Sequence, residues 1–351
     1  MSVIINILLF ILILGSIVFV HEFGHFIFAK ICGVYVYEFA LGMGPKLFSK
    51  KGKETEYSLR LIPIGGFCQM AGEDLDADKD NKIPKDKRLQ SKTAFQRFLI
   101  MFFGPANNFI FAVIILFFIA LVCGGTTMKP VISSVDDNYP ASIAGIESGD
   151  TVIRINNHKV STSDDITLYL AIADVKKTTK IEVKKSNGNF VVYNVKPKKV
   201  VQDGQDTYRY GVVIQQERSM GILNAFIYTF NKTKSIFKQM AITVGYLFTG
   251  GIKLTQLSGP VGIYSIVGSQ SKTGIANIFY LIAFLSINVG FINLIPLPAF
   301  DGGHILFIII EKIKGSPVNP ETENKIHTIG LFLLMLLMIF ITFNDILKIF
   351  K

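Results

Sequence analysis

The stretch VFVHEFGHFIFAK, residues 18–30, places two histidines and a glutamate in an apolar segment that begins at Val3. Ionisable side chains are costly inside a membrane and tend to mark function there. In the pattern H-E-x-x-H, His21 and His25 are four residues apart, so both imidazoles project from one face of a helix and can share a zinc ion. Glu22 stands beside them, where it can take a proton from water. The stretch therefore predicts a metal-dependent hydrolytic centre within a membrane helix, in preference to two histidines that are merely hydrogen-bonded in a core.

The composition is that of a membrane protein. Half of the 351 residues are hydrophobic and 30 are phenylalanine, which is too apolar for an ordinary soluble chain. Four apolar stretches reach or approach the ~20 residues that a spanning helix needs; they are residues 3–20, 98–123, 278–310 and 329–343. The first has no basic start, and HEFGH follows where a signal-peptide cleavage site would stand, so we expect it to be retained.

The charge distribution predicts the topology. The net charge is +10, but the lysines are spread over loops with acids among them, which argues against nucleic-acid binding. The loop at residues 30–97 contains 13 Lys or Arg, crowded at both membrane edges, and this favours the cytoplasm for that loop. By alternation, both termini and the stretch after Cys123 face outward.

A different pattern fills the middle of the chain. Short β-rich runs with turn signals extend from Pro130 to about Gln216. Within them, YPASIAGIESGDTVIRINNHKV (139–160) resembles the PDZ family, with a short helix, a Gly-Asp turn and a strand-turn-strand in that order. The predicted division is a membrane part at 1–124, a PDZ-like domain at 127–216, amphipathic connector helices at 217–277 and a second membrane part at 278–351.

A catalytic zinc ion needs a third protein ligand. Asp301 is the strongest candidate, because from Arg218 to Phe300 the chain has no acid and Asp301 then lies inside the third apolar stretch. Two prolines before Asp301 and two glycines after it predict an interrupted helix. Non-helical backbone is tolerated at membrane depth only where it is buried in protein or lines a water-filled cavity. A transporter-like broken helix is the alternative. Other candidates are His304 and Glu38, whereas His158 and His327 are expected at the surface.

Six motifs occur in an order that resembles one known family. They are HEFGH, GGFCQMAGE (65–73), FGPANN (103–108), the PDZ-like insert, LSGPVGI (257–263) and NLIPLPAFDGG (293–303). Together they resemble the site-2 protease family of intramembrane zinc metalloproteases, in its bacterial RseP/RasP-like branch. Phe300 and Phe103 depart from residues that are frequent in the family, but neither position is a ligand.

The resemblance assigns roles to particular residues. It implies that His21, His25 and Asp301 bind one Zn2+ and that Glu22 is the catalytic base. Asn293 is implied to position substrate. A membrane-associated β-hairpin is implied to receive the substrate on its edge strand, near the three consecutive residues Gly65, Gly66 and Phe67.

We therefore expect a polytopic α-helical membrane protein with about four transmembrane helices, a membrane-associated β-hairpin and an inserted α+β PDZ domain. The expected function is zinc-dependent endopeptidase cleavage within the membrane of single-span proteins, such as anti-sigma factors or remnant signal peptides. A non-catalytic PDZ-bearing scaffold and an ion-coupled transporter are the alternatives. We expect a multi-pass protein of a bacterial cell membrane, with its active site toward the cytoplasm and its PDZ domain outside, where that domain binds a peptide or excludes untrimmed substrates.

Overall fold

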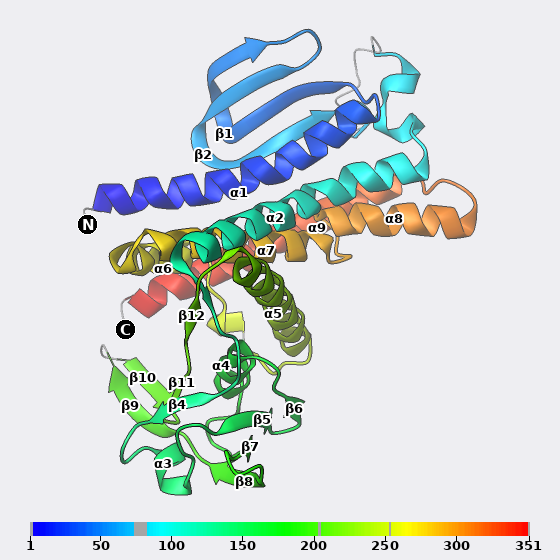
Figure 1. Ribbon diagram of the computed structural model, residues 1–351. Helices are drawn as coiled ribbons and strands as arrows, with labels where there is room; N and C mark the ends of the chain where they lie inside the picture. The colour runs from blue at the N-terminus through cyan, green and yellow to red at the C-terminus, as the bar shows by residue number, and fades with distance from the viewer. Residues whose placement is uncertain (1–2, 74–82, 203–204, 253, 350–351) are drawn as a thin grey trace. The chain divides into compact units, whose positions relative to one another are not determined.

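The computed structural model describes residues 3–73, 83–202, 205–252 and 254–349 (Figure 1). Its helices are α1 Val3–Ile31, α2 Ala94–Cys123, α3 Pro140–Ala144, α4 Ser163–Ala171, α5 Ile222–Phe248, α6 Pro260–Thr273, α7 Ile275–Leu294, α8 Asp301–Lys314 and α9 Pro320–Ile349. The chain divides into two compact units. The first unit is Met1–Leu116 with Leu254–Lys351, and the second unit is Phe117–Lys253.

The twelve strands within the described residues are short, apart from the first two. They are β1 Val36–Lys51, β2 Glu56–Met70, β3 Gly125–Thr126, β4 Ile132–Val135, β5 Thr151–Ile155, β6 His158–Lys159, β7 Thr179–Lys184, β8 Phe190–Val195, β9 Lys198–Gln202, β10 Gln205–Arg209, β11 Val212–Ile214 and β12 Arg218–Ser219.

Four of the described helices are long and apolar enough to cross a membrane. They are α1, α2, α7 and residues Glu321–Lys348 of α9. The prediction of about four spanning helices is thus confirmed, and each lies over one of the four apolar stretches. The first helix continues eleven residues past Val20, where the uncharged apolar stretch ends, so HEFGH lies within this helix as predicted.

The third apolar stretch is divided in two. The helix α7 ends at Leu294 and α8 begins at Asp301, so the predicted interruption is confirmed. Pro296 and Pro298 have no N–H to donate to a preceding helical carbonyl, and this ends the helix before them. Of the two helices in this stretch, α7 has the length and hydropathy of a span and α8 does not.

The two long strands form an antiparallel sheet in which each strand bends. Residues 36–41 pair with residues 66–70 on one side and with residues 56–59 on the other, and residues 46–51 pair with the outer side of 56–60. Glycines at the bends have positive φ, with 87° at Gly42 and 86° at Gly65, a conformation that glycine adopts at little cost. Within the described residues no strand pairs with the outer edge of residues 66–70.

This sheet packs on the membrane helices of the first unit (Figure 1). Their shared core takes residues from α1, β1, β2, α2, α8 and the segments between them: Ala29, Val34, Val36, Phe39, Cys68, Met70, Leu89, Ile100, Met101 and Ile308. Because the sheet and the helices bury the same cluster, the segment 66–70 is fixed beside α1.

A buried carboxylate joins α9 to α6. Asp345 is 2% exposed, and its Oδ2 accepts hydrogen bonds from the N–H groups of Gly259 (2.7 Å) and Gly262 (2.9 Å). These N–H groups lie at the start of α6, where the backbone has no helical acceptor and the helix dipole favours a negative charge. The LSGPVGI motif is therefore a helix start that docks on α9.

The second unit is an α+β domain with an additional long helix, α5. Its largest sheet has the strand order β6-β5-β7-β8, and β4 pairs with β11. The core lies between these strands and α4. Beside this core, Lys232 and Lys238 of α5 form ion pairs of 2.7 and 2.8 Å with Asp164 and Asp165 of α4. The predicted connector region at 217–277 thus divides, since α5 belongs to the second unit and α6 to the first.

Candidate metal centre

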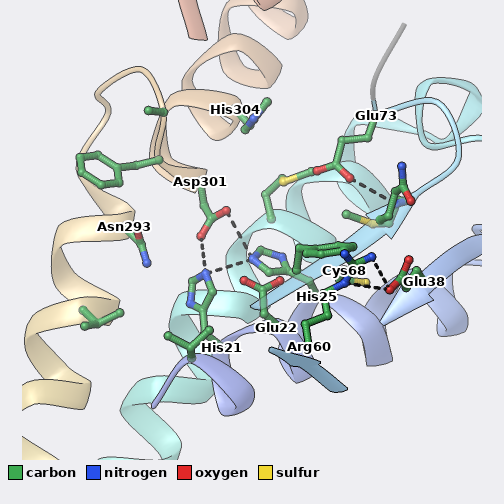
Figure 2. A pocket seen from close by; sticks show the side chains of 18 residues that line it. His21, Glu22, His25, Glu38, Arg60, Cys68, Glu73, Asn293, Asp301 and His304 are labelled. Atoms are coloured by element: carbon green, nitrogen blue, oxygen red, sulfur yellow. Dashed lines mark hydrogen bonds and ion pairs between the residues drawn. The ribbon is translucent and has the colours of Figure 1, made fainter. Parts of the chain in front are cut away.

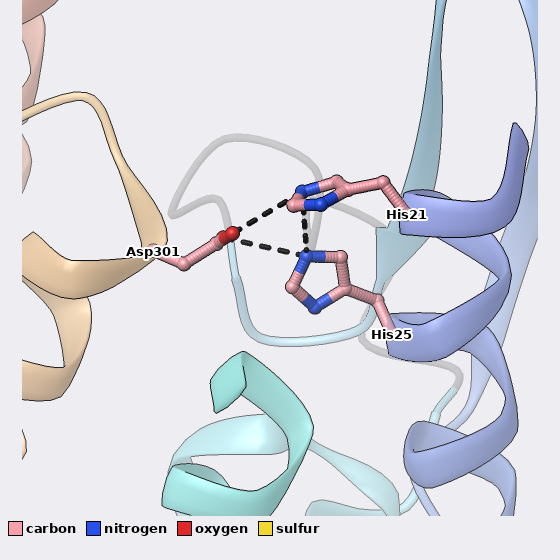
Figure 3. A group of neighbouring side chains, drawn as sticks. All are labelled: His21, His25 and Asp301. Carbon is pink, nitrogen blue, oxygen red and sulfur yellow. Dashed lines mark hydrogen bonds and ion pairs between the residues drawn. The ribbon is translucent and has the colours of Figure 1, made fainter. Parts of the chain in front are cut away.

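Three side chains from two distant parts of the sequence meet within the first unit (Figure 3). His21 and His25 project from one face of α1, and Asp301 comes from the first residue of α8. The two Nε2 atoms are 3.3 Å apart. Nε2 of His21 lies 3.2 Å from Oδ2 of Asp301, and Nε2 of His25 lies 3.3 Å from Oδ1. The structure therefore brings together all three residues that the sequence analysis proposed as ligands.

The donor atoms suit a zinc ion. Ligand atoms of a tetrahedral ion with bonds of about 2.0 Å are about 3.3 Å apart, and the observed separations are 3.2 to 3.3 Å. Two imidazoles and one carboxylate are a donor set typical of catalytic zinc, which keeps a further position for water. In addition, Oδ2 of Asp301 is buried and has no hydrogen-bond partner among the described residues. These residues fit the metal that their spacing predicts.

His25 is placed by a very close crossing of α1 and α2. Its Nδ1–H donates to the carbonyl of Ile100 over 2.9 Å. A Cβ on Gly104 would lie 2.1 Å from Nε2 of His25, and a Cβ on Gly24 would lie 2.0 Å from the carbonyl oxygen of Phe103. Only glycine fits at both positions, because a Cβ would overlap these atoms. The glycine of the Gly-Pro pair in FGPANN is thus where α2 leaves room for the side chain of His25.

Asp301 is placed by the tight turn before α8. A Cβ on Gly302 would lie 2.3 Å from the carbonyl oxygen of Ile295, and one on Gly303 would lie 2.5 Å from that of Leu297. The glycines after Asp301 therefore let the first turn of α8 pack directly on the backbone of the NLIPLP loop. The N–H of Ala299, two residues before the ligand, donates to Nδ1 of His327 on α9 over 3.2 Å.

The cluster opens onto a cavity of about 750 Å³ (Figure 2). Glu22 lines the same cavity as the three candidate ligands, so a water molecule in the cavity can reach its carboxylate. Polar side chains from the sheet, including Glu38 and Arg60, line another part of the wall. A water-filled route to this depth is a condition for hydrolysis inside a membrane protein.

The residues proposed for substrate binding differ in their positions. Asn293 and Phe67 line the cavity. Gly65 lies at the bend of β2, where a Cβ would meet the side chain of Met43. Gly66 lies against α1, and a Cβ there would be 3.2 Å from Val18 and 3.5 Å from Cγ of Glu22. The structure therefore brings the edge segment 66–70 close to the candidate base.

Glu38, the competing acid, is engaged elsewhere. It is 8% exposed and accepts hydrogen bonds from Ser58 and Arg60, and Lys46 lies 3.3 Å from its carboxylate. Burial raises the pKa of this carboxyl, but the hydrogen bonds from Ser58, Arg60 and Lys46 outweigh burial and leave its pKa below the usual value. Glu38 is therefore an ionised partner within the sheet and lies outside the metal cluster.

A second group of potential ligands lies beside the cavity. It consists of His304 on α8 with Glu323 and His327 on α9, and Nδ1 of His304 is 3.2 Å from Oε1 of Glu323. The two imidazole rings are stacked, with centroids 3.8 Å apart and an interplanar angle of 10°. Ring lone pairs lie in the ring planes, so two parallel stacked imidazoles cannot both aim at one ion. This geometry favours a packing role.

Two histidines expected at the surface are half-buried and have partners. His327 stacks on His304 and accepts the N–H of Ala299, so its prediction as a surface residue was wrong. In the second unit, His158 stacks on Tyr169 and shares a 2.9 Å hydrogen bond with the hydroxyl of Tyr246. Each ring packs between segments that are distant in sequence. Such contacts cannot be predicted from the spacing of residues within one segment.

Two site residues had no assigned role in the sequence analysis. Asn108 is fully buried, and its Nδ2 lies 3.3 Å from Nδ1 of His21. Glu73 lines the cavity, and burial raises the pKa of its carboxyl to about 7. The signal for Asn108 was present in the sequence as the pair Asn107-Asn108 inside an apolar stretch, because amides at such depth need partners.

Comparison with known proteins identifies the family. The model of peptidase family M50 matches residues 9–337. The regulator of sigma-W protease RasP of Bacillus subtilis is 34% identical over 98% of this chain and 99% of the relative. The zinc metalloprotease RasP of Bacillus licheniformis is 33% identical with the same coverage, and a putative zinc metalloprotease of Clostridium perfringens is 36% identical over 95% of this chain and 96% of the relative. With its ligand geometry and its family match in agreement, the chain belongs to peptidase family M50.

Proposed function

We propose that this chain is a zinc-dependent endopeptidase that cleaves peptide bonds within the membrane. The observation that carries the proposal is the convergence of His21, His25 and Asp301 on one cavity with Glu22, between helices that can span a membrane. The names of the Bacillus relatives, which call them proteases and a zinc metalloprotease, support the metal and the reaction. A scaffold without catalysis would have no use for a base beside a complete ligand set.

The chemistry divides between the metal and the protein. Zinc, when bound, supplies a Lewis acid that polarises the scissile carbonyl and lowers the pKa of water. Glu22 accepts the proton of the attacking water and delivers it to the leaving amine, so one carboxylate serves as base and then as acid. Asn293, on the α7 side of the cavity, holds the substrate backbone near Glu22.

The experiment is a cleavage assay on the purified full-length protein with a tagged single-span substrate. Glu22→Gln keeps the ligands and removes the base, so cleavage is expected to disappear while one zinc per chain remains. Asp301→Asn is expected to lower zinc content. Full activity in Glu22→Gln would refute the proposed base, and unchanged zinc in Asp301→Asn would refute the ligand.

The substrates are single-span membrane proteins, of which anti-sigma factors and remnant signal peptides are examples. A helical segment satisfies its own backbone hydrogen bonds, so it must be unwound before cleavage. Within the described residues no strand pairs with the outer edge of residues 66–69, so this edge can accept an added strand, and Phe67 to Met70 line the cavity. The name of the Bacillus subtilis relative, a regulator of sigma-W, supports the anti-sigma class.

Proline substitution tests this strand addition. Successive residues of a strand direct their N–H groups to opposite edges. Of Cys68→Pro and Gln69→Pro, one therefore removes a bond to residues 36–41 and destabilises the sheet, and the other removes a donor from the outer edge. The variant that keeps normal thermal stability and zinc content is expected to lose cleavage. Wild-type cleavage in that variant would exclude pairing through this edge.

The second unit is proposed to contain a PDZ domain at residues 127–216. A groove of about 420 Å³ runs between α4 and β11, with apolar residues such as Ile166, Leu170 and Val212 in its walls. An extended peptide can add to the strand edge in such a groove. Titration with a library of C-terminal peptides tests peptide binding; cleavage of untrimmed substrates after deletion of the domain tests its action as a size filter.

The membrane sidedness is also a proposal. The basic loop at residues 30–97 favours the cytoplasm for the metal centre, and α2 then carries the chain to the outer face of a bacterial cell membrane. Reporter fusions after residues 53 and 187, in turns of the two loops, are expected to report the cytoplasm and the outside respectively. The opposite pattern would reverse the orientation.

A further inference from the structure

The sheet of β1 and β2 has two chemically different faces beside the cavity. Successive side chains of a strand project to opposite faces of the sheet. On one face Phe39 pairs with Cys68, and the ring of Phe39 packs on phenylalanine rings of α1. On the other face Ala40 pairs with Phe67 on one side and with Ser58 on the other. The face that carries Phe67 is therefore turned away from α1.

The side chain of Arg60 lies on the same face as that of Phe67. Arg60 follows Ser58 by two residues, and its Cζ lies over the ring of Phe67 at 4.9 Å from the centroid. The electron-rich face of an aromatic ring attracts a cation at this distance. Ala40 lies between the two positions, and its short side chain lets the long side chain of Arg60 reach across the middle strand to the ring.

Three hydrogen bonds fix the guanidinium of Arg60. Its Nε and Nη2 donate to Oε1 of Glu38 over 3.2 and 2.7 Å, and its Nη1 donates to the carbonyl of Gly44 over 2.6 Å. Figure 2 shows Arg60 and Glu38 together on the wall of the cavity. Because a guanidinium is planar, three bonds in its plane also set the direction of its flat face. The cation is thus held rigidly where it lies over the ring of Phe67.

Stability alone is a weak reason for this arrangement. The side chains of Arg60 and Glu38 are only 18% and 10% exposed. At such burial the loss of hydration offsets much of the attraction within an ion pair. Glu38 also has other partners, since it accepts a hydrogen bond from Ser58 and lies 3.3 Å from Lys46. The contact of a fixed cation with a ring on the cavity wall therefore points to a role at the cavity.

Phe67 belongs to the edge segment that is proposed to pair with the substrate. Residues that lie directly opposite each other on neighbouring strands have Cβ atoms about 5 Å apart. A substrate residue that pairs opposite Phe67 therefore places its side chain beside the ring, on the side remote from Ala40. The ring of Phe67 forms one wall of the space for that side chain, and Arg60 covers a face of the same ring.

We propose that Phe67 forms a subsite for a branched apolar side chain of the substrate, and that Arg60 is the positioning residue that holds the ring in place. The inference rests on the proposed endopeptidase function and on pairing through this edge. Arg60 and Lys46 are each paired with a glutamate, Arg60 with Glu38 and Lys46 with Glu56. The subsite therefore selects by shape and apolar surface and not by charge.

The experiment measures kcat/KM of the purified full-length protein on tagged single-span substrates with Leu or Ala at successive positions of the cleaved segment. The wild type is expected to prefer Leu at one position by about 10-fold. Phe67→Ala is expected to abolish the preference at that position. Arg60→Lys keeps a charge beside Glu38 but lacks the planar cation, so the preference is expected to fall about 3-fold while thermal stability and zinc content remain.

A double variant separates positioning from a general structural role. If Arg60 acts through the ring, Arg60→Lys has no further effect on the preference once Phe67→Ala is present. The matched control is Lys46→Met. Lys46 also contacts Glu38, but it belongs to the segment beyond Arg60, one strand further from Phe67. Its preference for Leu is expected to equal that of the wild type.

A second measurement leaves Arg60 unchanged. Pentafluorophenylalanine in place of Phe67 keeps a ring of similar shape but withdraws electrons from its face, which removes the attraction for a cation. The preference for Leu is expected to fall as in Arg60→Lys. A wild-type preference with the fluorinated ring would overturn the positioning role, even if Arg60→Lys failed to fold.

Two further outcomes would overturn the inference. Equal preferences in the wild type and in Phe67→Ala at every substrate position would refute the subsite. Additive losses in the double variant would refute the action of Arg60 through the ring. Either result leaves the endopeptidase itself intact, because that function depends on Glu22. Cleavage that persists in Glu22→Gln would instead refute the proposed function, whatever the substrate preference.

Discussion

Gly104 on α2 lies directly against the imidazole of His25 on α1, so that a Cβ at residue 104 would be 2.1 Å from Nε2. The nitrogen of His25 that is proposed to bind zinc thus lies against a residue that has no side chain. Two membrane helices approach here more closely than any side chain between them would allow.

Gly104→Ala is therefore expected to displace His25 and to weaken zinc binding about 100-fold, comparable to the larger effects of altered ligand support. Zinc content after equilibrium dialysis measures this. Gly15→Ala is the matched control, because it lies on α1 and a Cβ there would meet nothing within 4 Å. Equal zinc content in the two variants would show that the crossing can relax without moving the ligand.

The contact of Asp345 with α6 is expected to stabilise the first unit without affecting the metal. Asp345→Ala leaves the N–H groups of Gly259 and Gly262 without their charged acceptor, which should cost about 2 kcal/mol. Thermal unfolding in detergent measures the loss. The neighbouring Asn344→Ala, which removes one hydrogen bond to the carbonyl of Thr255, should cost about 1 kcal/mol. A larger loss in Asn344→Ala would contradict the assigned importance of Asp345.

Glu73 predicts a dependence of stability on pH. Burial raises the pKa of its carboxyl to about 7, above its value in the unfolded chain. The folded state therefore holds this proton more tightly, and the stabilisation present at low pH is lost as the pH rises through 7. Glu73→Gln cannot ionise, so its unfolding free energy should exceed that of the wild type increasingly between pH 5 and pH 7. Parallel pH profiles of the two proteins would exclude this contribution.

Two neighbouring aspartates of α4 should differ in their effect on the second unit. Asp165 is 1% exposed and accepts the N–H groups of Ser161 and Thr162 as well as Lys238. Asp165→Ala should therefore cost about 3 kcal/mol. Asp164→Ala should cost about 1 kcal/mol, because the side chain of Asp164 is itself more exposed, 19% against 1% for Asp165. Hydrogen exchange of the α4 amides measures both. Equal protection in the two variants would contradict this ranking.

The three proposed ligands could be predicted from the sequence because each is an ionisable residue within an apolar stretch. His21 and His25 interrupt an apolar helix at a spacing that has one common chemical use, and Asp301 ends a long run without acids inside another apolar stretch. Such patterns lie within short stretches of sequence, so they can be recognised without knowledge of the fold. The interruption before Asp301 was predictable for the same reason, since proline acts on its own helix.

The residues that support the ligands could not be found in that way. The histidines are contacted by Ile100, Gly104 and Asn108, which are more than 70 residues away in sequence. The contacts are made by a backbone carbonyl, a glycine without a Cβ and a side-chain amide, and none of these groups indicates from sequence alone which residue it will contact. His327 was predicted at the surface because a polar loop precedes it. The prediction was wrong because its ring stacks on His304.

The helix α9 contains none of the three residues proposed to bind zinc, yet it contacts the turn that places Asp301. His327 accepts the N–H of Ala299, and Asp345 near the other end of α9 anchors α6. A small molecule that displaced the ring of His327 would release the turn before Asp301 from outside the catalytic cavity. Inhibitors of this protein therefore need not chelate zinc, and compounds without a metal-binding group would avoid the other zinc enzymes of a cell.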